Sequence, residues 1–142
     1  MHYGELISRV ALCAGALMGL GALIAPGWAA SLVRLTEDPA PTRPGGFSEF
    51  RATYGGFFLL THLGALLVAL YLPSPYAFFA ALPLALGWIG AGIGRLVSLA
   101  ADRSRNRATG CIPLFALLEL VVGLAIGCNT FQFIALIRQL SQ

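Results

Sequence analysis

Long apolar runs dominate the chain, and polar residues interrupt them at only a few places. Stretches of roughly 20 apolar residues, the length that a helix needs to cross a bilayer, fall at about residues 6–26, 49–71, 76–100 and 112–137. This pattern predicts an all-α fold: a single transmembrane domain, residues 1–142, that forms an integral membrane four-helix bundle.

The segments between the runs carry residues that end helices. Residues 27–48 open with an amphipathic piece, Trp28 to Leu35, which we expect to lie at the membrane interface. Three prolines and two glycines follow between residues 36 and 46, a composition typical of a loop. Pro73, Ser74 and Pro75 predict a tight turn, and Pro83 predicts a kink in the third span.

Composition supports lipid as the solvent. Hydrophobic residues make up 58% of the chain and charged residues 11%, whereas a soluble domain carries about 25% charged residues. All nine cations are Arg, and they form no basic run with interleaved aromatic residues, so we expect no nucleic-acid partner. The cysteines show neither CxxC nor metal-ligand spacing, which predicts small buried hydrophobes rather than a redox site; they are Cys13, Cys111 and Cys128.

The distribution of arginine predicts the orientation. The loops after the first and third spans hold most of the arginines, so the positive-inside rule places both long loops in the cytoplasm and both termini in the periplasm of a bacterial inner membrane. We expect the first run to be a retained span, because Arg9 interrupts it and Trp28 stands where signal cleavage needs a small residue. The loop arginines are Arg34, Arg43, Arg103, Arg105 and Arg107.

Glycine pairs four residues apart recur in three spans. Close backbone packing holds transmembrane helices together, so these pairs favour tight packing inside the bundle over contacts with other chains. The pairs are Gly15 and Gly19, Gly90 and Gly94, and Gly123 and Gly127.

Ionisable residues inside the spans are the candidates for function. At 1.5 Å per residue, Arg95 and Glu119 both lie roughly 7–10 Å below the cytoplasmic surface, which makes them plausible partners. Such residues either satisfy each other as a structural salt-bridge network or form a site for a polar or anionic head group, with Arg51 and Arg95 as its cations. A proton-coupled path through Glu119 is a third possibility. The predicted cluster is Glu49, Arg51, Tyr54, Arg95, Ser98 and Glu119.

His62 lies near the middle of the second span, apart from that cluster. One interpretation is a neutral imidazole that is hydrogen-bonded to a neighbouring helix. The other is an axial ligand to the magnesium of a chlorophyll-type pigment or to a five-coordinate haem, since the other histidine, His2, lies at the terminus.

The polar positions also resemble those of a known family. Glu49-Phe50-Arg51-Ala52-Thr53-Tyr54-Gly55-Gly56, with Gly94-Arg95-Leu96-Val97-Ser98 and Leu118-Glu119, is similar to the pattern of an uncharacterised family of small four-span bacterial membrane proteins. The resemblance covers the second to fourth spans and implies a four-helix membrane bundle without an assigned activity. Its shared polar positions coincide with the predicted cluster and do not include His62.

No catalytic motif is visible in the sequence: it has no nucleophile elbow, no HExxH and no phosphate-binding glycine loop. We therefore predict a non-enzymatic protein that contacts membrane lipids and other membrane subunits, as an accessory or assembly subunit of a larger complex. The alternatives are a small carrier or binding protein for a lipid or an anionic small molecule, and a pigment- or haem-binding subunit that uses His62.

Overall fold

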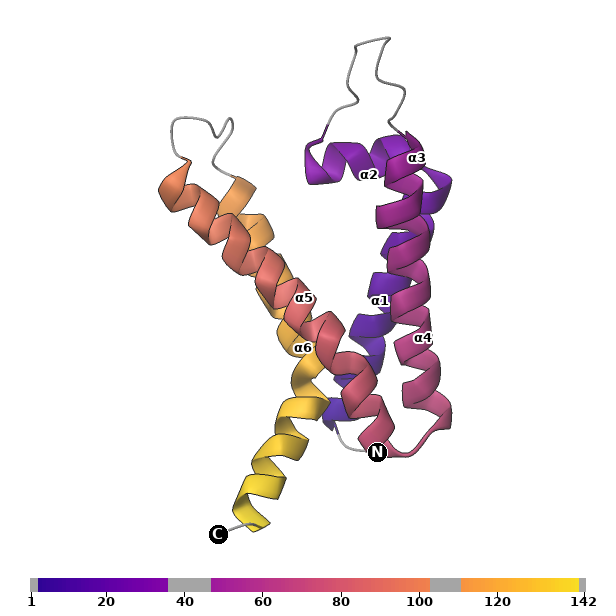
Figure 1. Ribbon diagram of the computed structural model, residues 1–142, viewed down its shortest axis with the longest axis vertical. Helices are drawn as coiled ribbons and strands as arrows, with labels where there is room; N and C mark the ends of the chain where they lie inside the picture. The colour runs from indigo at the N-terminus through magenta and orange to yellow at the C-terminus, as the bar shows by residue number, and fades with distance from the viewer. Residues whose placement is uncertain (1–2, 36–46, 103–110, 141–142) are drawn as a thin grey trace. The chain divides into compact units, whose positions relative to one another are not determined.

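The structure is a computed structural model that describes residues 3–35, 47–102 and 111–140 (Figure 1). Every regular element in these residues is helical, which confirms the predicted all-α class. The loops expected at residues 36–46 and 103–110 lie outside the described part. The elements are α1 (Tyr3–Ile24), α2 (Pro26–Val33), α3 (Phe47–Phe50), η1 (Arg51–Phe57), α4 (Phe58–Tyr71), α5 (Ser74–Ala101) and α6 (Ile112–Leu140).

Within the described residues, four helical stretches are long and apolar enough to cross a membrane. The second is continuous through α3, η1 and α4, and the third runs unbroken through Pro83. The turn predicted at Pro73 separates α4 from α5, and Pro73 is the N-cap of α5. The four stretches are Tyr3–Ile24, Phe47–Tyr71, Ser74–Ala101 and Ile112–Thr130.

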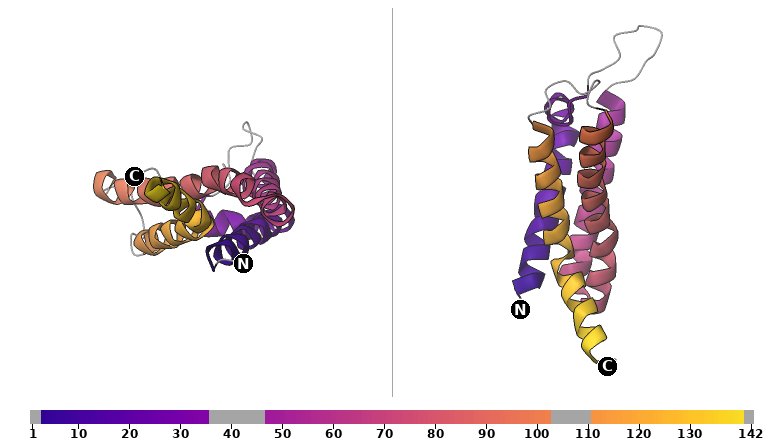
Figure 2. Two further views of the ribbon diagram at one scale, coloured as in Figure 1. Left: turned by 90° about the horizontal axis from the view of Figure 1, so that it is seen from below. Right: turned by 90° about the vertical axis from the view of Figure 1, so that its left-hand side faces the viewer.

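The chain divides into two compact units, which we describe separately. The terminal unit comprises residues 1–11 and 68–142, and the central unit comprises residues 12–67. In the terminal unit, α5 and α6 run antiparallel and side by side (Figures 1 and 2). Gly123 allows this approach, because a Cβ there would lie 2.8 Å from the carbonyl oxygen of Ala85.

Glycines of α1 make the same kind of close contact in the central unit. A Cβ on Gly19 would overlap the backbone nitrogen of Leu59 on α4. Gly15 packs equally closely against the ring of His62. The glycine pair in the first span therefore serves packing inside the unit, as the sequence predicted.

The segment η1 is a π-helix of seven residues, Arg51–Phe57. Its i→i+5 hydrogen bonds change the angular spacing of side chains, so residues 51–57 do not follow the 3.6-residue period that sequence analysis assumes. Gly55 explains a close approach at this point, because a Cβ there would lie 2.9 Å from the Cα of Leu23 in α1. The Glu-x-Arg-Ala-x-Tyr-Gly-Gly pattern thus coincides with a rare backbone geometry.

The burial of the cysteines differs from the prediction. Cys13 and Cys111 are exposed and Cys128 is half-buried, so they are not core residues. In an apolar helix that faces lipid, a free cysteine acts as a small hydrophobe in either position.

Candidate functional site

Arg95 and Glu119 form an ion pair across the packed faces of α5 and α6. The Nε atom of Arg95 donates to both carboxylate oxygens of Glu119, at 2.8 Å each. The Glu119 side chain is 11% exposed and that of Arg95 is 29% exposed. The Arg95 guanidinium carbon also lies 5.4 Å from the ring centroid of Phe115, within the range of a cation–π contact. The pairing that matched depth predicted is therefore confirmed.

The ion pair occupies only the Nε–H of the guanidinium, and its Nη1 and Nη2 groups do not contact Glu119. A guanidinium carries five N–H donors in a planar fork. Only the Nε–H meets Glu119, and in the described part of the terminal unit no side chain or carbonyl accepts from Nη1 or Nη2. Ser98 lies one helical turn beyond Arg95 on α5 and is half-buried. Four N–H donors therefore project from the pair.

The other three members of the predicted cluster belong to the central unit, where each has local surroundings. Glu49 is exposed in the short helix α3. The ring of Tyr54 stacks on Phe50, with centroids 5.4 Å apart and an interplanar angle of 27°. Arg51 donates from Nε to the carbonyl oxygen of Leu23, at 3.2 Å.

The contact between Arg51 and Leu23 completes the C-terminus of α1. The last carbonyls of a helix lack intrahelical donors, and Pro26, which begins α2, has no N–H to offer. A cationic donor at this end also complements the helix dipole. Arg51 thus acts as a side-chain cap for α1, a role that its place in an apolar run did not predict.

His62 is buried and already has a backbone partner. Its Nδ1 lies 2.8 Å from the carbonyl oxygen of Phe58, and because a carbonyl only accepts, Nδ1 carries the proton. The Phe58 ring lies against the imidazole, with centroids 4.6 Å apart. The Cδ2–Nε2 edge faces Gly15 so closely that a Cβ on Gly15 would lie 2.6 Å from Nε2.

That packing does not fit a pigment or haem. An axial ligand needs open space beyond Nε2 for a metal and its macrocycle, whereas the backbone of α1 occupies this position. The hydrogen bond from Nδ1 runs to Phe58 in the same helix rather than to a neighbouring helix as expected, and the contact with α1 at Gly15 is packing of the ring. In the described part of the chain, no three His, Cys, Asp or Glu side chains are grouped to hold a metal ion.

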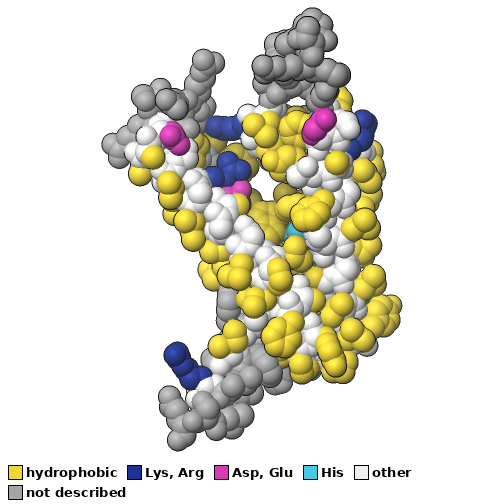
Figure 3. Space-filling model, viewed as in Figure 1, with side chains coloured by type: hydrophobic (Ala, Val, Ile, Leu, Met, Phe, Trp, Pro, Cys, Tyr) yellow, Lys and Arg dark blue, Asp and Glu magenta, His cyan; other side chains and the backbone are white. Residues whose placement is uncertain are grey.

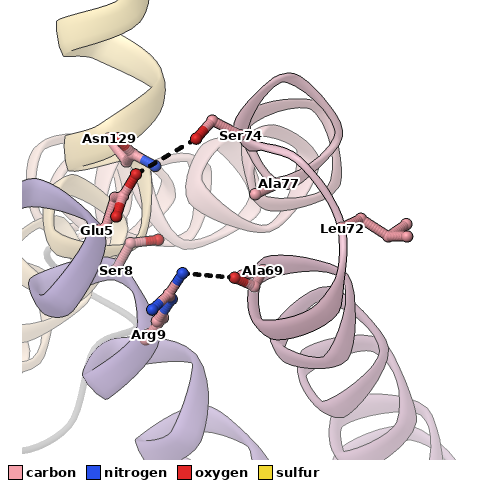
Figure 4. Close-up of a pocket in the computed structure, with 8 residues that line it drawn as sticks. All are labelled: Glu5, Ser8, Arg9, Ala69, Leu72, Ser74, Ala77 and Asn129. Atoms are coloured by element: carbon pink, nitrogen blue, oxygen red, sulfur yellow. Dashed lines mark hydrogen bonds between the residues drawn. The ribbon is translucent and has the colours of Figure 1, made fainter. Parts of the chain in front are cut away.

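A second polar cluster, which we call the turn clamp, lies in the terminal unit around the turn between α4 and α5 (Figure 4). The Ser74 hydroxyl donates to Glu5 Oε1 at 3.3 Å, and Arg9 Nη2 donates to the carbonyl oxygen of Ala69 at 2.8 Å. The buried Ser8 hydroxyl donates to the carbonyl oxygen of Ile126 at 2.7 Å. A cavity of about 20 Å³, the size of one water molecule, lies among Glu5, Ser8, Arg9, Ala69, Leu72, Ser74, Ala77 and Asn129.

The turn clamp places charge where the helix dipoles favour it. Arg9 lies at the C-terminus of α4, and the Glu5 carboxylate lies at the N-terminus of α5. Arg9 was expected only to interrupt an apolar run, so this cluster was not predicted from the sequence. The available signal was the spacing of Glu5 and Arg9, since residues four apart share a helix face.

The resemblance of the Glu49–Gly56 pattern to a known family stays a prediction. Searches of protein-family models, of curated proteins and of solved structures give no match to this chain.

Proposed function

We propose that this protein is a non-enzymatic membrane subunit that packs against helices of a larger membrane complex. The observation that carries the proposal is a strip of glycine on α5 against which the described part of the terminal unit packs nothing. A Cβ added at Gly87, Gly90 or Gly94 would meet no described atom within 4 Å. Spacings of three and four residues place the three on one face of the helix.

Other glycines of α5 and α6 lie where the two helices pack closely against each other. Gly92 packs against Leu120 of α6, and Gly123 packs against Ile89 of α5. The exposed strip has the same composition, but no other helix of the terminal unit packs on it. Within the terminal unit, Gly90 and Gly94 therefore do not form the internal packing contact that their spacing predicted.

The surroundings of the strip favour a helix as its partner. The large side chains beside it are exposed and apolar: Leu86, Ile93 and Val97 are 54%, 51% and 58% exposed. Figure 3 shows the exposed backbone of α5 bordered by hydrophobic side chains. Small residues let two backbones approach, and flanking aliphatic side chains then supply the van der Waals contact that associates helices in lipid.

We further propose that the membrane is the bacterial inner membrane, with both termini in the periplasm. The excess of arginine in the loops after the first and third spans supports this orientation. With the three native cysteines replaced by alanine, cysteine labelling from outside intact cells at single engineered positions near each terminus tests it. Labelling of the loop between α5 and α6 from outside the cell would instead show the opposite orientation.

Native mass spectrometry of the protein extracted from its own membranes in mild detergent tests the subunit proposal. We expect a complex that contains other polypeptides and that Gly90→Ile and Gly94→Ile deplete. Gly64→Ile is the matched control, because Gly64 is also an open glycine in a span. A protein that runs only as a monomer or homo-oligomer, unchanged by Gly90→Ile, would contradict the proposal.

A further inference from the structure

We propose that the free edge of the Arg95 guanidinium binds a phosphate group, as a site for an anionic phospholipid at the end of the α5–α6 pair. The inference is independent of the subunit proposal, because it rests on the ion pair rather than on the glycine strip. Its first support is the geometry of the pair. Both Glu119 oxygens are held by Nε alone, so Nη1 and Nη2 keep their four N–H donors.

The depth of Arg95 matches that of lipid phosphates. Helix α5 has 28 residues, or about 42 Å at 1.5 Å per residue, against a hydrocarbon core of about 30 Å. A centred helix thus extends about 6 Å beyond the core at each end. Arg95 precedes the last residue, Ala101, by six positions or about 9 Å. Its Cα therefore lies near the edge of the hydrocarbon, and its side chain can reach the head groups.

The N–H donors on Nη1 and Nη2 of Arg95 need an acceptor, because they are partly removed from water. Taking guanidinium N–H groups out of water without acceptors is costly, and 71% of the Arg95 side chain surface is covered, since 29% is exposed. Glu119 satisfies only one of the five donors. Phosphate oxygens suit the rest, because a guanidinium binds them by two parallel hydrogen bonds.

The charged groups around Arg95 are compatible with a bound anion, although their charges already balance in part. Glu119 neutralises Arg95, and Asp102, the half-buried C-cap residue of α5, follows seven positions later. The sequence then continues with Arg103, Arg105 and Arg107. Basic residues beside a membrane helix attract anionic lipid. An anionic phospholipid therefore suits the site better than a zwitterionic one, whose choline would add a cation beside Arg95.

Lipid adducts of the full-length protein, measured by native mass spectrometry, test the site. Phosphatidylglycerol and phosphatidylcholine with identical chains are the probes, and inorganic phosphate is the competitor. We expect Arg95→Lys, which keeps the charge but loses the fork, to weaken phosphatidylglycerol binding roughly tenfold, as for one lost charge-assisted contact. Arg138→Lys is the control, because Arg138 is exposed in the last turn of α6. Equal adducts in Arg95→Lys and the wild type would overturn the proposal.

A second variant keeps the test decisive if Arg95→Lys does not fold. Glu119→Gln retains every Arg95 donor and raises the local charge by one, so phosphatidylglycerol binding should strengthen. A purely structural ion pair predicts lower stability in Glu119→Gln without stronger binding, and that result would also overturn the proposal. Displacement of the lipid by millimolar inorganic phosphate identifies a free anion as the ligand of the same site. Persistence of the lipid identifies the phospholipid.

Discussion

The Nη2 atom of Arg9 donates to the carbonyl oxygen of Ala69 at 2.8 Å, so a residue in α1 caps the C-terminal end of α4, in the second membrane-length stretch. Arg51 does the same for Leu23 at the end of α1. Two arginines that the sequence places within or beside apolar runs therefore donate to backbone carbonyls near helix C-termini. Such carbonyls have no water to accept from inside a bilayer.

Replacement of Arg9 should loosen the turn between α4 and α5. Arg9→Met keeps the apolar stem and removes the donor, and we expect a loss of about 1–3 kcal/mol, as for a hydrogen bond to a charged group. Arg9→Lys should lose less, because an ammonium can still reach one carbonyl. Thermal unfolding in detergent measures the difference. An unchanged midpoint for Arg9→Met would show that the contact does not stabilise the protein.

Replacement of Arg51 tests its role as a helix cap. Arg51→Leu should expose the C-terminal carbonyls of α1 and reduce stability by about 0.5–1 kcal/mol, whereas Arg51→Lys should retain most of it. Amide hydrogen exchange gives the most direct measurement. We expect faster exchange in the last turn of α1 and the start of α2 in Arg51→Leu, with α5 and α6 unaffected. Uniformly faster exchange would point to global destabilisation instead.

Hydropathy and helix length were enough to predict the all-α class and the four membrane-length helices, because lipid permits few alternatives to a helix with internal hydrogen bonds. Matched depth was enough to pair Arg95 with Glu119. The π-helix at Arg51–Phe57 could not be predicted from the sequence pattern, since hydrophobic periodicity reports only the regular 3.6-residue helix. The turn clamp was missed because Glu5 and Ser74 are distant in sequence, and only packing brings them together.

The contact between Gly15 and His62 gives a prediction about packing. Gly15→Ala should clash with the buried imidazole and cost about 1–3 kcal/mol, as for overpacking. Gly64→Ala should be neutral or stabilising, because Gly64 has open space around it and alanine is the better helix former. Unfolding of both variants in detergent measures the contrast.

His62→Ala supplies the double-variant test of that contact. It removes the ring that Gly15→Ala would strike, so the double variant should lose less stability than the two single variants added together. Strict additivity would mean that the imidazole and Gly15 are not in contact.

The Arg95–Glu119 pair should show the asymmetry of a partly buried ion pair. Arg95→Leu leaves the Glu119 carboxylate, 11% exposed, without its donor. A broken buried pair costs about 3–5 kcal/mol, and the partial exposure of Arg95 reduces this figure through screening. Arg95→Leu combined with Glu119→Leu leaves no charge unpaired and should recover most of the loss. Protein abundance in the membrane and the unfolding midpoint provide the two measurements. If the double variant is as unstable as Arg95→Leu, the cost arises from the lost Arg95 contact with Phe115 rather than from an unpaired carboxylate.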